Sequence, residues 1–338
     1  MTCLAMICGS EGTSLSPREI AFFRETRPAG FILFARNCET PDQVQALTSE
    51  FLACVQHEAL VLIDQEGGRV QRLTPPVWPA YPAGEMFGAL YNKNSDKGME
   101  AARLSARLIG NDLHALGINM DCLPVLDLAF PGRHKVIGDR AYHRDPDVVA
   151  QIGRAASEGL MSSGVLPVIK HIPGHGRADA DSHETLPEVG AALEELNSSD
   201  FVPFRTLSDM PAAMTAHILY TGLDAVRPAT TSPRIIREVI RESIGFQGLL
   251  MSDDVSMGAL KGTVGARAQA LFSAGCDLAL HCNGDMKEME DLAENTPALS
   301  GISKRRYEAA LAMIHPPDDL NRKHAWDRLQ TLLAEAVS

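Results

Sequence analysis

Short apolar runs alternate with segments of helical periodicity along most of the chain. The first apolar runs span residues 3–8, 30–34, 59–63 and 165–170. None shows strict alternation of apolar and polar positions, which is typical of parallel strands buried on both faces. Residues 40–57 illustrate the intervening helices, because Thr40 can cap this helix and Pro41 can start it. This alternation predicts an α/β protein.

Eight strand-then-helix units can be counted in this way. No G-x-G-x-x-G motif follows any of the strands, so the pattern favours a single (β/α)₈ TIM-type barrel over a doubly wound sheet. Residues 74–88 are rich in proline and glycine and are expected to be irregular, whereas residues 193–206 are expected to form one helix. Helices from about residue 300 onward are expected to pack outside the barrel, so residues 1–338 form a single domain. The direction of the second strand stays open.

Composition and charge narrow the functional classes. The chain has 45% hydrophobic and 22% charged residues, which is ordinary for a globular protein, and a formal net charge of −12. This charge, without a basic cluster, argues against binding to nucleic acid or to an anionic membrane surface. No apolar stretch reaches the length of a membrane span, and the N-terminus lacks the features of a signal peptide. Seven cysteines without C-x-x-C spacing are expected to be reduced, which predicts a cytoplasmic location.

Residues 170–188 form the most polar segment, K-H-I-P-G-H-G-R-A-D-A-D-S-H-E-T-L-P-E. Its prolines and glycines predict a loop, and it follows an apolar strand. Titratable groups on a loop after a strand indicate a functional site. The alternative is a solvated turn.

Other polar residues also follow predicted strands. The C-terminal ends of barrel strands converge on one face, so these side chains are expected to line one pocket. They are Asp64, Lys170, His171, His217, Asp253, His281 and Asn283.

The run G-L-L-M-S-D-D at residues 248–254 ends in two carboxylates. Neighbouring residues on a strand point to opposite sides, so only one of the two can face the barrel mouth. We expect Asp253 to face the mouth as a nucleophile, base or metal ligand, and Asp254 to cap the next helix.

Five motifs together carry a family resemblance. They are K-H-I-P-G-H-G at 170–176, D-S-H at 181–183, G-L-L-M-S-D-D at 248–254, D-Q-E-G-G-R-V-Q-R at 64–72 and V-I-G-D-R at 136–140. In their order along the chain they resemble the β-N-acetylhexosaminidases of glycoside hydrolase family 3, and more closely the short bacterial cytoplasmic enzymes of peptidoglycan recycling.

The resemblance implies an exo-acting, retaining β-N-acetylglucosaminidase. It assigns the nucleophile to Asp253, the general acid/base to His183, and the partner of that imidazole to Asp181. The implied substrate is N-acetylglucosamine linked to 1,6-anhydro-N-acetylmuramic acid, with or without a stem peptide. We further expect a monomer without cofactor or metal, whose partner is this small-molecule glycan. The residues implied to bind the sugar are Asp64, Arg72, Arg140, Lys170 and His171.

A histidine acid/base is chemically reasonable, because an imidazole titrates near neutrality and can both donate and accept a proton. Asp181 would stabilise the imidazolium form. A carboxylate-bearing substrate would be repelled by the acidic protein, so the cations Arg72, Arg140 and Lys170 are expected to offset this locally.

Three alternatives remain. An acid that is not anionic also permits phosphate as the attacking group, which would make the protein a phosphorylase. His171, His175, Asp179, Asp181 and His183 could hold a divalent metal in a metal-dependent hydrolase, although Pro173 and Gly174 break the helical spacing of the common zinc motif. The last alternative is a sugar-binding protein without turnover.

Overall fold

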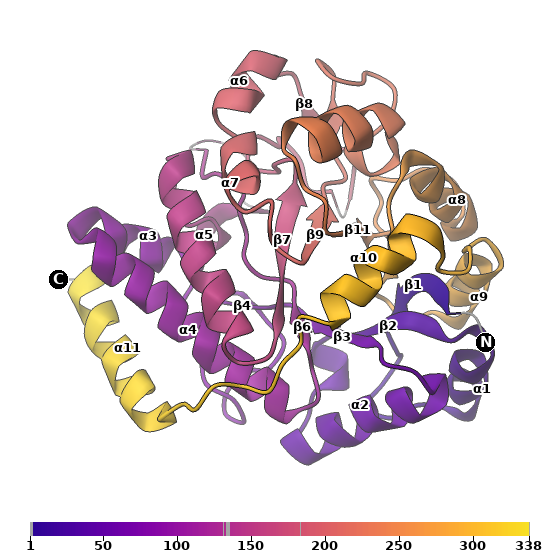
Figure 1. Ribbon diagram of the computed structural model, residues 1–338, viewed down its shortest axis with the longest axis horizontal. Helices are drawn as coiled ribbons and strands as arrows, with labels where there is room; N and C mark the ends of the chain where they lie inside the picture. The colour runs from indigo at the N-terminus through magenta and orange to yellow at the C-terminus, as the bar shows by residue number, and fades with distance from the viewer. Residues whose placement is uncertain (1–2, 131, 133–135, 183, 338) are drawn as a thin grey trace.

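The computed structural model describes residues 3–130, 132, 136–182 and 184–337. Within these residues, eight parallel strands form a closed barrel with the order β1-β12-β11-β9-β7-β6-β3-β2. Figure 1 shows helices surrounding this barrel. The prediction of a (β/α)₈ barrel is therefore confirmed.

The barrel strands correspond closely to the apolar runs. They are β1 Leu4–Cys8, β2 Pro28–Leu33, β3 Leu60–Ile63, β6 Met120–Asp121, β7 Leu166–Ile172, β9 Ala212–Thr215, β11 Leu249–Asp254 and β12 Leu278–His281. Strand β2 is parallel to both of its neighbours. Two small sheets lie outside the barrel, one formed by β4 Gln65–Gly67 with β5 Val70–Gln71, the other by β8 Glu188–Val189 with β10 Leu219–Tyr220.

The helices fill the intervals between the strands. They are α1 Pro17–Thr26, α2 Pro41–Val55, α3 Gly84–Lys93, α4 Ser95–Ala115, α5 Pro146–Met161, α6 Leu193–Ser198, α7 Phe201–Thr206, α8 Val264–Ala274, α9 Met286–Glu294, α10 Gly301–Leu311 and α11 Arg322–Val337. Short 3₁₀ turns lie at η1 Ala35–Asn37, η2 Gly138–Arg140 and η3 Ala229–Thr231, and η4 Ile235–Ser243 is a π-helix. As predicted, Thr40 caps α2 by accepting a hydrogen bond from the Gln43 amide.

Buried apolar side chains form two clusters. One fills the inside of the barrel and includes Leu62, Met120 and Met251, and the other lies between the barrel and its helices and includes Phe51 and Leu250. Alternate residues of each strand supply the two clusters, because successive side chains point to opposite faces. This two-sided burial explains why the strands lack alternation in the sequence.

Two expected elements differ from the structure. Residues 74–88 are not wholly irregular, because α3 begins at Gly84. The single helix expected at 193–206 is two helices that break at Ser199. The break places Pro203 in the first turn of α7, where its missing N–H and its ring are tolerated.

The C-terminal helices contact the barrel and its surrounding layer. Tyr307 of α10 donates its hydroxyl hydrogen towards the carbonyl oxygens of Ala29 and Glu58, at the N-terminal ends of the strands. Figure 1 shows α11 beside α3 and α4, and its Leu329 and Leu332 are fully buried. Among the described residues, no helix has the length and apolar character to cross a membrane.

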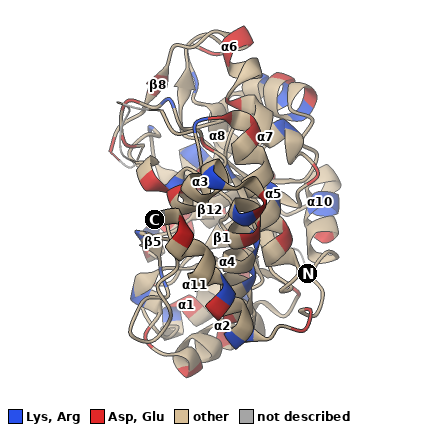
Figure 2. Cartoon of the chain, turned by 90° about the vertical axis from the view of Figure 1, so that its left-hand side faces the viewer, with Lys and Arg blue, Asp and Glu red and all other residues tan. Residues whose placement is uncertain are grey.

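Charged residues of both signs are interspersed over the helices in Figure 2, including α4, α5 and α11. Many are paired across helices, as Arg328 of α11 is with Glu100 of α4. Such exposed pairs contribute little stability each.

Candidate active site

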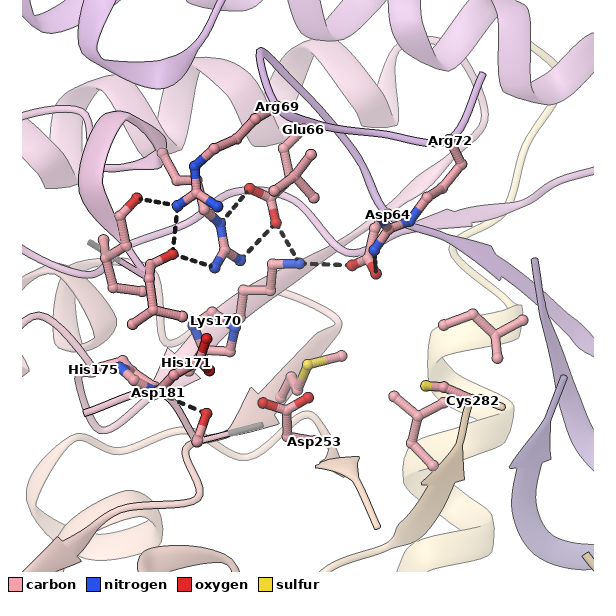
Figure 3. Close-up of a pocket in the computed structure, with 18 residues that line it drawn as sticks. Asp64, Glu66, Arg69, Arg72, Lys170, His171, His175, Asp181, Asp253 and Cys282 are labelled. Atoms are coloured by element: carbon pink, nitrogen blue, oxygen red, sulfur yellow. Dashed lines mark hydrogen bonds and ion pairs between the residues drawn. The ribbon is translucent and has the colours of Figure 1, made fainter. Parts of the chain in front are cut away.

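A cavity of about 450 Å³ opens at the C-terminal ends of the barrel strands. Figure 3 shows the side chains that surround it, which come from strands and loops far apart in the sequence. Of the predicted site residues, the structure brings seven to this cavity. Its polar lining comprises Asp64, Glu66, Arg69, Arg72, Arg140, Lys170, His171, His175, Asp181, Ser182, Asp253 and Cys282.

The hairpin of β4 and β5 positions the first carboxylates. It directly follows β3, and Gln65 holds it in place by accepting hydrogen bonds from the amides of Arg72 and Leu73 through its side-chain oxygen. The turn needs Gly67, whose φ is 94° and whose hydrogen faces the Pro82 carbonyl at a distance that excludes a Cβ. The Asp64 and Glu66 side chains both reach the cavity as a result.

Three cations and these two carboxylates form one ion-pair network. The Lys170 ammonium lies 2.8 Å from Asp64 Oδ1 and 2.7 Å from Glu66 Oε1. Arg140 donates to both oxygens of Glu66 at 2.8 Å, and Arg72 donates to Asp64 Oδ2 at 2.9 Å. Figure 3 shows these contacts as a continuous chain across the pocket.

The network fixes the charge of its members. Burial alone would raise the pKa of Asp64 and Glu66, but the neighbouring Lys170, Arg72 and Arg140 lower both pKa values below their ordinary range. Burial alone would lower the pKa of Lys170 and Arg140, but the two carboxylates raise them instead. All of these groups are therefore ionised near neutral pH.

Buried Asp127 organises the two histidines at the start of the polar loop. Its Oδ2 lies 2.6 Å from His171 Nδ1, and its Oδ1 accepts the amide hydrogens of His171 and His175. Because an ionised carboxylate only accepts, His171 carries a hydrogen on Nδ1. The lone pair of a neutral His171 is then on Nε2.

Strand β11 separates its two terminal carboxylates as predicted. Asp253 lines the cavity, whereas Asp254 points away and accepts hydrogen bonds from the Ser256 amide and hydroxyl and from the Cys282 amide. Asp254 does not cap the next helix, because α8 starts ten residues further on and Thr263 caps it. The role of Asp254 is to tie β11 to β12.

The polar loop differs partly from its prediction. Strand β7 continues through Lys170 and His171 to Ile172, so the loop starts three residues later than expected, and β8 occupies its far end. Asp181 lines the cavity, and the amides of Glu184 and Thr185 donate to its backbone carbonyl. His183, the predicted acid/base, lies outside the described residues.

His175 lines the cavity, whereas His217, which was predicted to line it, does not. The His175 Nε2 lies 3.2 Å from the Ser182 hydroxyl, which ties the start of the loop to its end. The His217 Nε2 lies 3.0 Å from the Asp254 carbonyl oxygen at the end of β11. Predicted positions His281 and Asn283 bind Glu288 and do not line the cavity.

The metal alternative requires a cluster of ligands at the polar loop. Among the residues that the structure describes, no group of three or more His, Cys, Asp or Glu side chains is arranged to hold a metal ion. His183, a member of the proposed ligand set, lies outside these residues.

Sequence reasoning missed Glu66, Arg69, Asp127 and Cys282. Glu66 stands two positions after Asp64, and residues two apart on a strand share a face, so this signal was available. Asp127 ends the apolar run L-P-V-L-D and could have been found by the same rule as Asp253. Cys282 had no distinguishing signal, because a thiol in an apolar run resembles any small core residue.

Comparisons with known proteins agree with this site. The family model described as glycosyl hydrolase family 3 N terminal domain matches residues 18–315. A β-hexosaminidase of Bordetella avium is 38% identical over 326 residues, which cover 94% of this chain and 89% of that protein. The crystal structure of NagZ from Neisseria gonorrhoeae in complex with N-trifluoroacetyl-D-glucosamine has a TM-score of 0.86 and 31% identity, covering 99% of this chain and 98% of that one. NagZ from the same organism is also known in complex with zinc ion, with a TM-score of 0.85, 30% identity and coverage of 100% and 99%.

The barrel, the cavity at its C-terminal face and these matches define a glycoside hydrolase. The chain belongs to glycosyl hydrolase family 3, and within that class it is a β-N-acetylhexosaminidase. The family and the enzyme class predicted from the motifs are both confirmed.

Proposed function

We propose that the protein is an exo-acting, retaining β-N-acetylglucosaminidase. Asp253 attacks the anomeric carbon and forms a covalent glycosyl-enzyme, while His183 transfers its proton to the departing glycosidic oxygen. His183 then removes a proton from water, and the resulting hydroxide displaces Asp253 to release the sugar with its original configuration. Asp181 stabilises the imidazolium form that His183 has before the first step and regains in the second.

The observation that carries this proposal is the position of Asp253. Its carboxylate shares one cavity with Asp64, Arg140 and Lys170, although these residues come from four separate segments of the chain. Figure 3 shows the Asp253 carboxylate facing the Lys170 network across the pocket. A nucleophile must face the ring that such polar groups would hold, so this arrangement supports the assigned roles.

The proposed substrate is N-acetylglucosamine attached to 1,6-anhydro-N-acetylmuramic acid, with or without peptide, as arises in peptidoglycan recycling. The related NagZ from N. gonorrhoeae forms a complex with N-trifluoroacetyl-D-glucosamine, which supports an N-acylated glucosamine as the sugar that this protein binds. We propose that Asp64, Arg72, Arg140, Lys170 and His171 bind this ring.

We further propose that the protein acts in the cytoplasm as a monomer and that residues 1–338 form one domain. All seven cysteines are free thiols, and five of them are buried, which supports a reducing compartment. Burial of α11 against α3 and α4 supports a single folding unit.

Product analysis tests the reaction. Purified muropeptides are incubated with the protein in the presence and absence of inorganic phosphate, and the products are identified by mass spectrometry. We expect free N-acetylglucosamine in both cases. N-acetylglucosamine 1-phosphate formed only with phosphate would show the phosphorylase instead, and no cleavage would favour a sugar-binding protein.

The Asp253 assignment predicts the effect of Asp253→Ala. Without the nucleophile no glycosyl-enzyme can form, so turnover of a chromogenic N-acetylglucosaminide should fall by at least roughly a thousandfold. Circular dichroism should show an unchanged fold. Asp254→Ala is the matched neighbour on the same strand, and an equal loss in both variants would contradict the assignment of Asp253 as the attacking group.

Chelation tests the metal-dependent alternative. We expect prolonged dialysis against a chelator to leave turnover unchanged, because no proposed step uses a metal. The zinc complex of NagZ from N. gonorrhoeae makes zinc the ion to add back. Activity that is lost on chelation and restored by zinc would replace the proposed mechanism.

A further inference from the structure

The Glu66 carboxylate forms ion pairs with Arg140 and Lys170, the two most buried cations of the cavity. Its Oε1 lies 2.7 Å from the Lys170 ammonium and 2.8 Å from Arg140 Nη2, and its Oε2 accepts from Arg140 Nε at 2.8 Å. Only 3% of the Glu66 side chain and 2% of the Lys170 side chain are exposed. A buried carboxylate of this kind is compatible with folding only when charged donors surround it.

These contacts determine how Arg140 is presented. Arg140 donates from Nε and Nη2 to the two carboxylate oxygens of Glu66, which makes a bidentate pair. Its Nη1 donates to the Val136 carbonyl oxygen at 3.1 Å. The guanidinium is planar, so three bonds from two sides fix both its position and its orientation. Only the remaining hydrogens of Arg140 can reach a ligand, and their direction depends on Glu66.

The same carboxylate aligns Lys170. Its ammonium donates to Asp64 Oδ1 at 2.8 Å and forms an ion pair with Glu66 Oε1 at 2.7 Å. These two contacts hold the ammonium between the two carboxylates. Glu66 therefore helps to fix the position from which Lys170 can donate to a sugar hydroxyl.

Glu66 itself is held rigidly. It lies on β4 between Gln65, which binds Asp121 through its backbone N–H and the Arg72 amide through its side chain, and Gly67, which is packed against Pro82. A Cβ on Gly67 would lie 2.3 Å from the Pro82 carbonyl oxygen, so the hairpin has no room to shift in that direction. A rigid support is what a positioning residue requires.

We propose that Glu66 is the positioning residue of the sugar-binding site, which orients Arg140 and Lys170 and balances their charge so that the site accepts an uncharged sugar ring. This rests on the proposed function of the cavity. The three cations Arg72, Arg140 and Lys170 face the two carboxylates Asp64 and Glu66, which leaves one positive charge among the five groups. Without Glu66, two positive charges would remain among the other four groups. Arg140 and Lys170 would each lose a contact that fixes its orientation.

The test is the isosteric substitution Glu66→Gln. Its amide can accept through one oxygen only, and its NH₂ group faces a cation. Arg140 and Lys170 bind the ring before and during reaction, so the loss should appear mainly in binding. We expect KM for a chromogenic N-acetylglucosaminide, and the Kd of N-acetylglucosamine measured by calorimetry, to rise roughly 10- to 100-fold, while kcat changes only a few-fold.

A double-mutant cycle with Arg140→Lys distinguishes positioning from a general structural effect. Because Glu66 acts partly through Arg140 and partly through Lys170, the double variant should lose clearly less binding than the sum of the two single losses. Glu288→Gln provides the matched control, because Glu288 binds His281 and Asn283 at the same end of the barrel but does not line the cavity. Its KM and Kd should equal those of the wild type.

Several results would overturn the proposal. They are an unchanged Kd in Glu66→Gln, fully additive losses in the cycle, or an equal loss in Glu288→Gln. If Glu66→Gln does not fold, Glu66→Asp keeps the charge but is one methylene too short to reach both cations, and it should raise the Kd in the same sense. Because the Kd needs no turnover, a wild type that binds the sugar without cleaving it would refute the proposed function and leave this test intact.

Discussion

At the scale of single residues, the chemistry depends on partners that are remote in sequence. His171 owes its tautomer to Asp127, 44 positions earlier, through a contact of 2.6 Å between Nδ1 and Oδ2. Burial would raise the pKa of Asp127, but the adjacent His171 and His175 lower it to about 2. The carboxylate is thus ionised at neutral pH and holds the hydrogen of His171 on Nδ1. A neutral His171 therefore carries its acceptor lone pair on Nε2.

Asp127→Asn tests this arrangement. The amide nitrogen would donate to His171 Nδ1 and move the ring hydrogen to Nε2, so His171 would no longer accept there. We expect kcat/KM to fall roughly 10- to 100-fold, the range for losing a hydrogen bond to a charged group. Asp277→Asn is the control, since Asp277 is equally buried and ion-paired to Arg241, away from the cavity. Equal kcat/KM losses in both folded variants would contradict a specific role for Asp127.

At the scale of elements, close packing of α3 positions one wall of the site. A Cβ on Gly84 would lie 2.3 Å from the Arg140 carbonyl oxygen, and one on Gly88 would lie 1.7 Å from that of Tyr142. The two glycines therefore let α3 approach the segment that carries Arg140. Sequence reasoning took the glycines of this region as signs of irregular structure, whereas they serve the contact between a helix and a backbone segment.

Gly88→Ala tests the importance of this contact. The added methyl must push α3 away from Tyr142, and overpacking of this kind costs about 1–3 kcal/mol of unfolding free energy. The displaced segment should also misplace Arg140 and raise KM. Gly12→Ala is the matched control, because nothing lies within 4 Å of its Cβ position. Denaturant unfolding and steady-state kinetics measure both effects, and equal stability of the two variants would refute the packing argument.

At the scale of the whole molecule, the cavity offsets little of the net charge of −12. Arg72, Arg140 and Lys170 are paired with Asp64 and Glu66, and Asp253 adds a further carboxyl group to the same cavity. The positive charges of these three cations are thus largely balanced by the carboxylates that they contact. Long-range repulsion of an anionic substrate should consequently remain, and screening by salt should weaken it.

Stability should depend on pH through the buried His175. Burial, reinforced by His171, lowers its pKa to about 4 from the ordinary value of 6.5. The folded protein therefore keeps His175 neutral while the unfolded chain takes up a proton, so stability is full above pH 6.5 and decreases as the pH falls towards 4. The difference corresponds to roughly 3 kcal/mol at most.

Urea unfolding of the wild type and of His175→Gln at several pH values between 7.5 and 4.5 measures this contribution. Paired carboxylates contribute mainly below this window, because their depressed pKa values keep them ionised in it. The wild type should lose more stability across the window than His175→Gln. Parallel curves for the two proteins would show that His175 is not the responsible group.

The amino-acid pattern was sufficient for the order and type of most elements, the barrel class and the family. Apolar runs and caps such as Thr40 act locally, so they can be interpreted without knowledge of distant contacts. The motifs also located Asp64, Arg72, Arg140, Lys170, His171, Asp181 and Asp253, whose roles remain predictions. The break at Ser199 and the start of α3 were missed, because both depend on packing against other segments.

Tertiary structure alone decided which groups meet. The sequence could suggest that Lys170 and Glu66 face a pocket, but their contact across 104 positions follows from the closure of the barrel, which brings β3 and β7 to one rim. The closed barrel also sets β2 parallel to its neighbours and brings the Asp127 carboxylate within hydrogen-bond distance of the His171 imidazole. Local propensity and periodicity are properties of short segments, whereas partners, charge states and strand direction depend on distances that only the folded chain defines.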